Sequence, residues 1–508
     1  MTATIVAPSP SLRAPAPERR LRSGLTIAGL GVAGGAVSLI GIGVPSFWGD
    51  EAASVLSAER PLPSLIRELM HVDAVHGLYY VFLHFWIGAF GASEAAVRFP
   101  STVAAGFAIA GTVALGWELF GPRAAVLAGL AAMAIPELTR MAIEGRSYAI
   151  GMATAVWLTW LLVRLVRRGE TRRRMWALYA VGTGLSVVLF MYLGFMVLVH
   201  LVVLVVQRPP RRVTQAWLES LLVATAVALP LVLVALNQQH QIAFLAHRHY
   251  ATFTNVVIRQ WFGTWYVAAM GWALILAGVA TTALCRPPKP EAGRNAIIVW
   301  SWLLLPTTLL LAGNTWLHPM YNMRYVAFCV PAVALGAAIG IDGLASLAKS
   351  RRIGRVVAVS IVIGLMLACV PRFAAQRTPY AKDGGSDLSQ IATAVGGHAA
   401  SGDGIVFDES VKPRLKPRLA LDLYPGDFTG IDDVALIAPA AAGSSLWDHL
   451  SALDTLGEKV TSHRVVWAVE AKHSSSTDLD VLTALGYQVV DTITLHRTVL
   501  YELVKGSS

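Results

Sequence analysis

Residues 25–52 read LTIAGLGVAGGAVSLIGIGVPSFWGDEA. Residues 25–44 are almost wholly apolar, and about 20 apolar residues are what a helix needs to cross a hydrocarbon core about 30 Å thick. An N-terminal run of this kind could imitate a signal peptide, but no convincing small-residue cleavage site follows it and many further apolar runs do. The stretch therefore predicts a first transmembrane helix that ends beside two adjacent carboxylates.

The composition of the whole chain agrees with a membrane protein. Its 508 residues are 55% hydrophobic and only 14% charged, with a mean hydropathy of +0.58. These values exclude a soluble enzyme, a disordered chain and a secreted disulfide scaffold. The three cysteines lie in or beside apolar runs, so no disulfide framework can be read from them.

Ten further apolar segments bring the expected number of transmembrane helices to about eleven. They are residues 95–118, 124–142, 147–166, 176–190, 194–206, 217–236, 266–284, 296–313, 325–347 and 355–371. Arg-rich loops stay in the cytosol, and residues 164–174 hold six arginines. We therefore expect a multi-pass protein of the plasma (inner) membrane, with residues 1–22 as a disordered cytosolic tail and the C-terminus outside. The net charge of +10 reflects this topology, so no nucleic-acid partner is expected beside the lipid bilayer.

Residues 77–91, GLYYVFLHFWIGAFG, are apolar but are expected not to cross the membrane. If this segment crossed the membrane, the Arg-rich loop 164–174 would lie outside the cell. That would violate the rule that Arg-rich loops stay in the cytosol, which this loop follows most strongly. The segment is short and holds six aromatic residues, which favours a helix lying at the outer membrane interface. A short tilted span is the alternative.

The chain changes character at about residue 372. The last 137 residues carry 12 basic and 17 acidic residues, and their apolar stretches shorten to the length of strands, with helical patterns between them. This alternation predicts an extracytoplasmic α/β domain over residues 372–508, after a membrane domain over residues 23–371.

The most informative polar string is FWGDE, residues 47–51. Carboxylates at a membrane boundary are costly to place against lipid, so Asp50 and Glu51 are expected to face water or a cavity. There a carboxylate can take a proton from an attacking hydroxyl, as a general base does. The alternative is structural: Asp50 starts the next helix as a cap, and Glu51 favours the positive end of that helix.

Further polar residues are expected at the same outer level. Glu137, Arg140 and Glu144 have helical spacing, Arg146 follows them, and His71, Asp73 and His76 lie in the preceding external loop. Two later external loops add His240, His247, Arg248, His249 and Arg259, and then His318, Arg324 and Tyr325. Acids beside cations suit a transfer reaction with a phosphate leaving group. Singly, each of the histidines and arginines is better explained by headgroup contact or snorkelling.

Several motifs together resemble the GT-C glycosyltransferases, over residues 25–345. They are GDEA at 49–52, D-x-x-H with a following aromatic run at 73–80, RFPS at 98–101, EGRSYA at 144–149, and MRY at 323–325 with a proline at 331. The most similar branch holds the protein O-mannosyltransferases and the lipid A aminoarabinose transferase. The resemblance implies transfer of a sugar from a polyprenyl phosphate carrier to an acceptor on the outer face.

The resemblance also implies roles for individual residues. It makes Asp50 the general base, places Glu144 in the family's second acidic loop, and assigns Arg324 to the carrier phosphate. Glu51, the neighbour of Asp50, is a further catalytic candidate from its position alone. Tyr325, Arg248, Arg259 and His318 join the expected phosphate-binding group, and Asp73, His76 and Arg146 the acceptor side. The mechanism implied is a single displacement with inversion. Where relatives commonly read H-P-P-L-Y-Y, this chain has His76-Gly77-Leu78-Tyr79-Tyr80, which puts the shape of the acceptor side in doubt.

The substrates and any metal are less determined. Thirty-three arginines against eight lysines are typical of a GC-rich, actinobacterial genome, which favours a decaprenyl-type carrier and mannose over arabinose or another sugar. The acceptor could be a glycan, a glycolipid or a protein. No metal site is certain, although a divalent cation, Mg²⁺ or Mn²⁺, bridging Asp50 and the phosphate would make chemical sense.

Two other classes of function compete with the transferase. A transporter or lipid flippase would place charges near the membrane midplane in paired halves, whereas here the acids gather at one face. A scaffold or receptor that binds through its outer domain would not need Asp50 and Glu144 at the same depth relative to the membrane. A glycosidase fits less well, because no carboxylate pair flanking a bond is evident.

Overall fold

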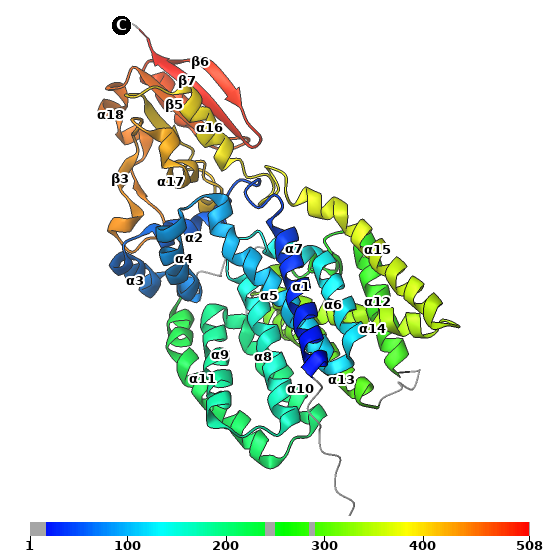
Figure 1. Cartoon of the computed structure of the whole chain (residues 1–508). Coiled ribbons are helices and arrows are strands. Elements are labelled where there is room, and N and C mark those ends of the chain that lie inside the picture. Colours follow the sequence, from blue (N-terminus) through cyan, green and yellow to red (C-terminus); the bar gives the residue numbers. More distant parts are fainter. Residues whose placement is uncertain (1–16, 239–248, 284–289, 318, 507–508) are drawn as a thin grey trace, which may run out of the picture.

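The computed structural model describes residues 17–238, 249–283, 290–317 and 319–506. A bundle of helices occupies one end of the molecule and a sheet domain the other (Figure 1). Every segment predicted to cross the membrane contains a helix. The bundle helices are α1 (Pro17–Leu39), α5 (Glu94–Phe120), α6 (Pro122–Ala134), α8 (Tyr148–Arg168), α9 (Arg173–Leu189), α10 (Met196–Gln207), α11 (Arg211–Asn237), α12 (Trp265–Ala283), α13 (Pro290–Trp316), α14 (Val330–Ser346) and α15 (Arg351–Ala375).

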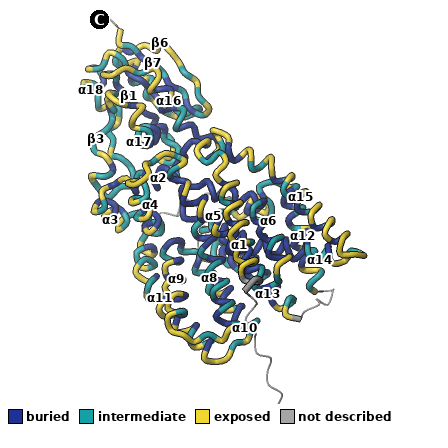
Figure 2. Tube along the Cα trace, viewed as in Figure 1, coloured by how far each residue is buried: buried dark blue, intermediate teal, exposed yellow. Residues whose placement is uncertain are grey.

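The helices confirm a multi-pass membrane protein, but they do not confirm the number of spans. Within the described ranges, seven helical segments are long and apolar enough to cross a membrane; α1, α6, α9 and α10 are not among them. The predicted number of eleven spans therefore remains a prediction. Of these seven segments, those with α5 and α14 are the most buried, whereas α11 and α15 are the least buried (Figure 2).

The predicted span 124–142 is broken rather than continuous. Helix α6 ends at Ala134, Ile135 takes an extended conformation, and the short helix α7 (Pro136–Met141) follows. Proline cannot donate a backbone hydrogen bond and disfavours helical geometry in the residue before it, so the break falls at Pro136. As a result Glu144 lies in the turn after α7, and not on one helix face with Glu137 and Arg140 as its spacing suggested.

The first external loop forms a compact group of helices. These are α2 (Gly49–Glu59), α3 (Leu62–His71), the 3-10 turn η1 (Ala74–His76) and α4 (Gly77–Phe90). Helix α4 confirms the helix predicted at residues 77–91; its place at the membrane interface stays a prediction. Figure 1 shows α2, α3 and α4 between the bundle and the sheet domain.

The C-terminal part is a mixed α/β domain, as the sequence predicted. Its sheet has the order β2 (Asp432–Asp433), β1 (Gly404–Phe407), β5 (Val465–Ala471), β7 (Thr498–Lys505) and β6 (Tyr487–Thr494). Strand β1 pairs in parallel with β2 and β5, and β7 is antiparallel to both its neighbours. The helices are α16 (Leu388–His398), α17 (Leu419–Leu423), α18 (Gly457–Thr461) and α19 (Asp478–Ala484), and β3 (Leu436–Ala438) and β4 (His449–Leu450) form a small second sheet.

One hydrophobic core joins the first external loop to the C-terminal domain. Phe47, Val55 and Tyr80 are fully buried in the same cluster as Leu388 and Trp467. Burial of apolar surface is the main stabilising contribution in such a contact. The shared core holds the C-terminal domain directly over the GDEA motif, although more than 300 residues separate the two in the chain.

Candidate active site

Asp50 lies in the first turn of α2 and contacts a cation from a segment that is distant in the sequence. The N-cap of α2 is Trp48, so Asp50 is not the cap that the alternative interpretation proposed. Its Oδ2 accepts a hydrogen bond of 2.7 Å from Arg324, which stands in the 3-10 segment η5 (Met323–Cys329). Burial favours a higher pKa for Asp50, but the charges of Arg324 and Arg146 outweigh burial and lower the pKa below its usual value. Asp50 is therefore ionised at neutral pH.

Glu51, the next residue, points into a different environment and is completely buried. Arg98 binds it with two hydrogen bonds of 2.9 and 2.7 Å, and the backbone N–H of Gly145 donates a third of 2.8 Å. Arg98 also donates to the carbonyls of Ile42 and Pro45, just after α1. The pair thus connects the start of α2 with the end of the first apolar segment and with the loop that carries Glu144.

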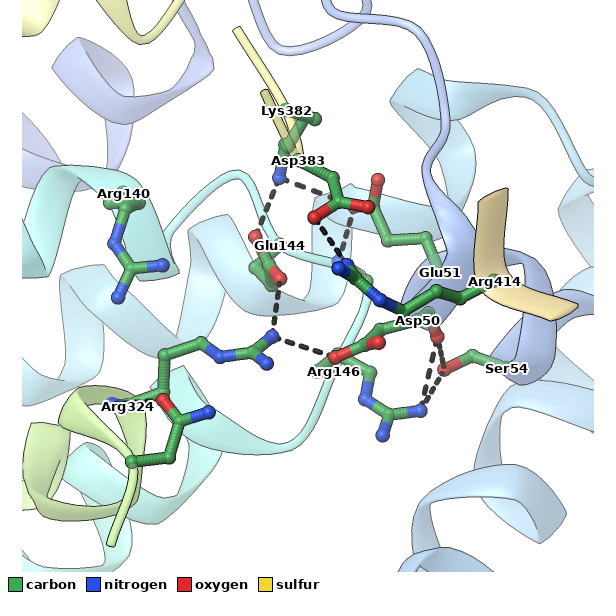
Figure 3. Close-up of polar contacts among 12 residues, drawn as sticks. Asp50, Glu51, Ser54, Arg140, Glu144, Arg146, Arg324, Lys382, Asp383 and Arg414 are labelled. Carbon is green, nitrogen blue, oxygen red and sulfur yellow. Dashed lines mark hydrogen bonds and ion pairs between the residues drawn. The ribbon is translucent and has the colours of Figure 1, made fainter. Parts of the chain in front are cut away.

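Lys382 joins the two glutamates and was not predicted. Its Nζ lies 2.7 Å from Glu144, 3.5 Å from Glu51 and 2.6 Å from the carbonyl of Ile143, and the side chain is 8% exposed. Arg324 approaches Glu144 to 3.8 Å from the other side. Figure 3 shows Glu144 between Lys382 and Arg324, with Asp50 on the far side of Arg324. The one signal in the sequence was the position of Lys382 shortly after the last apolar segment.

Arg146 gathers the acceptor-side residues that the sequence predicted. It donates to the backbone carbonyl of Asp50 (3.1 Å), to the hydroxyls of Ser54 and Tyr80 (3.0 and 3.1 Å), and to Nε2 of His76 (2.9 Å). Asp73 accepts a hydrogen bond of 2.9 Å from Tyr80. Burial and the nearby Arg146 lower the pKa of His76 well below its usual value, so this histidine is neutral. Asp73, His76 and Arg146 therefore form one network directly behind Asp50.

A cavity of about 230 Å³ opens beside these residues. Its basic lining residues are Arg140, Arg324, Arg372, Lys382 and Arg414, and its acidic ones are Glu144 and Asp383. Asp383 forms an ion pair with Arg414, and Arg140 pairs with Glu137 at 2.7 Å. The excess of guanidinium and ammonium groups makes the cavity suited to an anion such as a phosphate.

The other predicted phosphate-binding residues are placed less favourably. Tyr325 stacks on Tyr192, with ring centroids 4.8 Å apart, and does not line the cavity. Arg259 is exposed at the end of the segment Thr254–Arg259 and also lies outside the lining. Arg248 and His318 fall outside the described residues. Arg140, Arg372 and Arg414, which the sequence did not assign to the phosphate, line the cavity instead.

The residues around Asp50 do not form a set of metal ligands. Within the described ranges, no group of three or more His, Cys, Asp or Glu side chains gathers as a metal site would need. Asp50, Glu51 and Glu144 each contact an arginine or a lysine, so fixed cations already balance their charge. We therefore derive no chemical step through the Mg²⁺ or Mn²⁺ considered from the sequence.

Comparison with known proteins shows the fold. A family model described as dolichyl-phosphate-mannose-protein mannosyltransferase matches residues 78–236. The structure of ArnT from Cupriavidus metallidurans bound to undecaprenyl phosphate superimposes with a TM-score of 0.59 at 15% identity, covering 96% of this chain and 98% of that one. The chain has the GT-C glycosyltransferase fold.

The apo state of the same ArnT matches this GT-C chain with a TM-score of 0.57 at 14% identity, covering 95% of this chain and 98% of the other. The match includes the C-terminal domain as well as the bundle. No curated protein matches the chain by sequence. The resemblance inferred from GDEA, EGRSYA and the other motifs is therefore confirmed at the level of the fold.

Proposed function

We propose that this chain is an inverting glycosyltransferase of the plasma (inner) membrane. It takes a sugar, with mannose favoured, from a decaprenyl-type polyprenyl phosphate and delivers it to an envelope acceptor on the outer face. The GT-C fold, the family description of residues 78–236 and the undecaprenyl phosphate bound by ArnT support the carrier. The N-terminal tail (residues 1–22) is then cytosolic, residues 23–371 form the catalytic membrane domain, and residues 372–508 are extracytoplasmic.

The observation that carries the proposal is the pairing of Asp50 with Arg324, a residue that lines the cationic cavity. Asp50 retains 24% of its side-chain exposure and Arg324 retains 16%, so both can meet a substrate. One group is an ionised carboxylate that can accept a proton, and the other is a guanidinium that can bind a phosphate. A transferase needs both groups, and because they contact each other directly here, the donor phosphate would replace Asp50 as the partner of Arg324.

The reaction follows from these two groups. Asp50 accepts the proton of an acceptor hydroxyl while that oxygen attacks the anomeric carbon. The bond between the anomeric carbon and the phosphate oxygen breaks, and the electron pair leaves with the carrier phosphate. Arg324 and the cavity cations Lys382 and Arg140 stabilise the growing negative charge on the phosphate. Attack from the face opposite the leaving group inverts the anomeric centre.

The two glutamates that the sequence predicted to be catalytic act as positioning residues in this proposal. Glu51 is buried and saturated by Arg98 and Gly145, so it cannot reach a substrate and acts as a positioning residue. Glu144 places Lys382 and Arg324 at the cavity wall. Both glutamates thus act through the cations that they hold.

The donor can be named by direct assay. Membranes that contain the protein are incubated with a panel of radiolabelled polyprenyl phosphate sugars and native envelope acceptors, and label released from the carrier is measured. We expect one donor to be consumed, with mannosyl phosphate carriers preferred. Consumption of none of the donors would contradict the transferase and favour the transporter or flippase, which transport assays would then test.

A further inference from the structure

A second cavity lies in the C-terminal domain, away from Asp50. It has a volume of about 360 Å³, within the range of small-molecule sites. It is formed at the ends of three strands: Phe407 closes β1, Ala435 follows β2, and the segment 475–478 follows β5. Helix α19 and the segment 451–454 supply the remaining walls.

The topology of the sheet makes this a favoured place for a ligand. Strands β2, β1 and β5 are parallel, so their carboxyl ends meet at one edge of the sheet. The chain passes from β1 to β2 on one side and later returns to β5 on the other side of β1. In open α/β sheets, ligands bind outside the carboxyl ends of the strands at such a reversal of strand order.

The lining excludes the anions that often occupy sites of this kind. Its charged residues are Glu409, Asp454 and Asp478, and no lysine or arginine lines it. Glu409 is paired with Lys416, whereas Asp454 and Asp478 take part in no ion pair within the described ranges. A phosphate or a nucleotide would therefore be repelled, in contrast to the cationic cavity beside Arg324.

The same lining suits a neutral carbohydrate. Its hydroxyl groups come from Ser410, Ser451, Ser475, Ser476 and Thr477, and the carboxylates accept hydrogen bonds from sugar hydroxyls. Apolar side chains complete the walls and can pack against the C–H face of a sugar ring; they are Val406, Phe407, Leu453 and Val481. A few polar groups set among apolar walls are the general pattern of a specific small-molecule site.

Asp478 also interacts with a buried acidic residue that does not line the cavity. Glu470, on β5, is 7% exposed, and its burial together with the charge of Asp478 raises the pKa of Glu470 to about 8. Glu470 is therefore largely protonated at neutral pH and adds little negative charge beside Asp478. Among the described residues, no three His, Cys, Asp or Glu side chains gather as a metal site would need, which favours a neutral sugar over a divalent cation.

One loop connects this cavity to the catalytic one. Glu409 and Ser410 line the C-terminal cavity, and Arg414, five residues beyond Glu409, lines the cavity beside Arg324. Five residues span at most about 18 Å, so the two cavities are neighbours. We propose that the cavity at the carboxyl ends of β1, β2 and β5 binds a neutral glycan and holds it as the acceptor, an inference that rests on the proposed glycosyltransferase function.

The test measures glycan binding separately from transfer. The full-length protein in detergent is applied to an array of neutral oligosaccharides (mannan, arabinan, galactan and glucan fragments) with uronic acid oligosaccharides as charged controls. The variants are Ser451→Trp, which fills the cavity, and Asp478→Asn, which removes a charge with little change of shape. The matched control is Thr492→Trp, exposed on the edge strand β6 at the other end of the sheet. Melting temperature verifies the fold of each variant.

We expect the wild type to bind one class of neutral oligosaccharide. Affinity should fall about tenfold or more in Ser451→Trp and Asp478→Asn, as expected for loss of space or of hydrogen bonds to a ligand, and stay unchanged in Thr492→Trp. Asp50→Asn should bind the same glycan normally even though it transfers no sugar. If the wild type binds no neutral glycan, or if both cavity variants bind like the wild type, the inference is wrong. Transfer by Ser451→Trp at the normal rate and KM would also contradict it, without affecting the proposed activity.

Discussion

Arg324 donates a hydrogen bond of 2.7 Å to Asp50 across 274 positions of the chain. The guanidinium also lies over the ring of Trp48, 4.9 Å from its centroid, so it is held on two sides. This contact places the proposed base and the proposed phosphate ligand in one pair. A bound phosphate would compete with Asp50 for Arg324, so donor binding and the availability of the base are coupled.

Replacing Arg324 with lysine should impair the transfer step. Lysine keeps the charge but loses the planar fork that reaches both Asp50 and a phosphate. We expect the transfer rate to fall by about 10²–10³, the range found when one group that stabilises transition-state charge is removed. Single-turnover rates with saturating donor measure this. Arg259→Lys is the matched control, because Arg259 lies outside the cavity lining; an equal loss in both variants would contradict the assignment.

Glu51→Gln should damage the fold more than Asp50→Asn does. Arg98 would lose its charged partner in a fully buried position, and breaking such a pair costs about 3–5 kcal/mol. We expect a lower melting temperature and a lower yield of folded protein. A Glu51→Gln variant that melts like the wild type and still transfers no sugar would instead support the catalytic role predicted from the sequence.

Lys382 should act on donor binding as well as on stability. Lys382→Met leaves Glu144 without its 2.7 Å partner and removes one cation from the cavity. We expect a higher KM for the donor together with a lower melting temperature, and partial recovery of both in Lys382→Arg. A fall in melting temperature with an unchanged KM would show that Lys382 only holds the domains together.

Glu470 should make the stability of the protein depend on pH. Its pKa is about 8 in the folded protein against 4.5 for the free group, so the fold favours the protonated form. This contribution is complete below pH 4.5 and is lost as the pH rises through 8. The melting temperature of the wild type should therefore fall between pH 5 and pH 9, and Glu470→Gln should reduce that fall. Glu502→Gln, on the neighbouring strand β7, is the control; identical pH profiles for wild type and Glu470→Gln would refute the prediction.

Much of the fold could be predicted because it depends on local patterns. Apolar runs of sufficient length predicted the helices, and the Arg-rich loop 164–174 kept residues 77–91 out of the set of spans. The alternation of short strands and helices predicted the C-terminal α/β domain, although α15 continues past the predicted boundary at residue 372 to Ala375. The break at Pro136 follows from the proline itself, which a count of apolar residues does not register. The number of true spans depends on packing and on the lipid, which hydropathy alone does not describe.

The site was predictable only in part. Asp50, Glu144 and Arg324 stand in recognisable motifs, so their meeting could be expected. Lys382 could not be assigned, since a single lysine after the last helix has no motif, and its role follows from the folding of the C-terminal domain onto α2. Conversely, Glu51 stands next to Asp50 in sequence, yet adjacent residues on a helix point in different directions.

The most direct test of the central claim is sugar transfer by Asp50→Asn. This variant keeps the size of the side chain and one oxygen for Arg324, but it cannot accept a proton. We expect a folded protein that melts near the wild-type temperature, binds the polyprenyl phosphate sugar, and has lost nearly all transfer to the acceptor. A folded Asp50→Asn protein that transfers sugar at the wild-type rate would contradict the role of Asp50 as the general base.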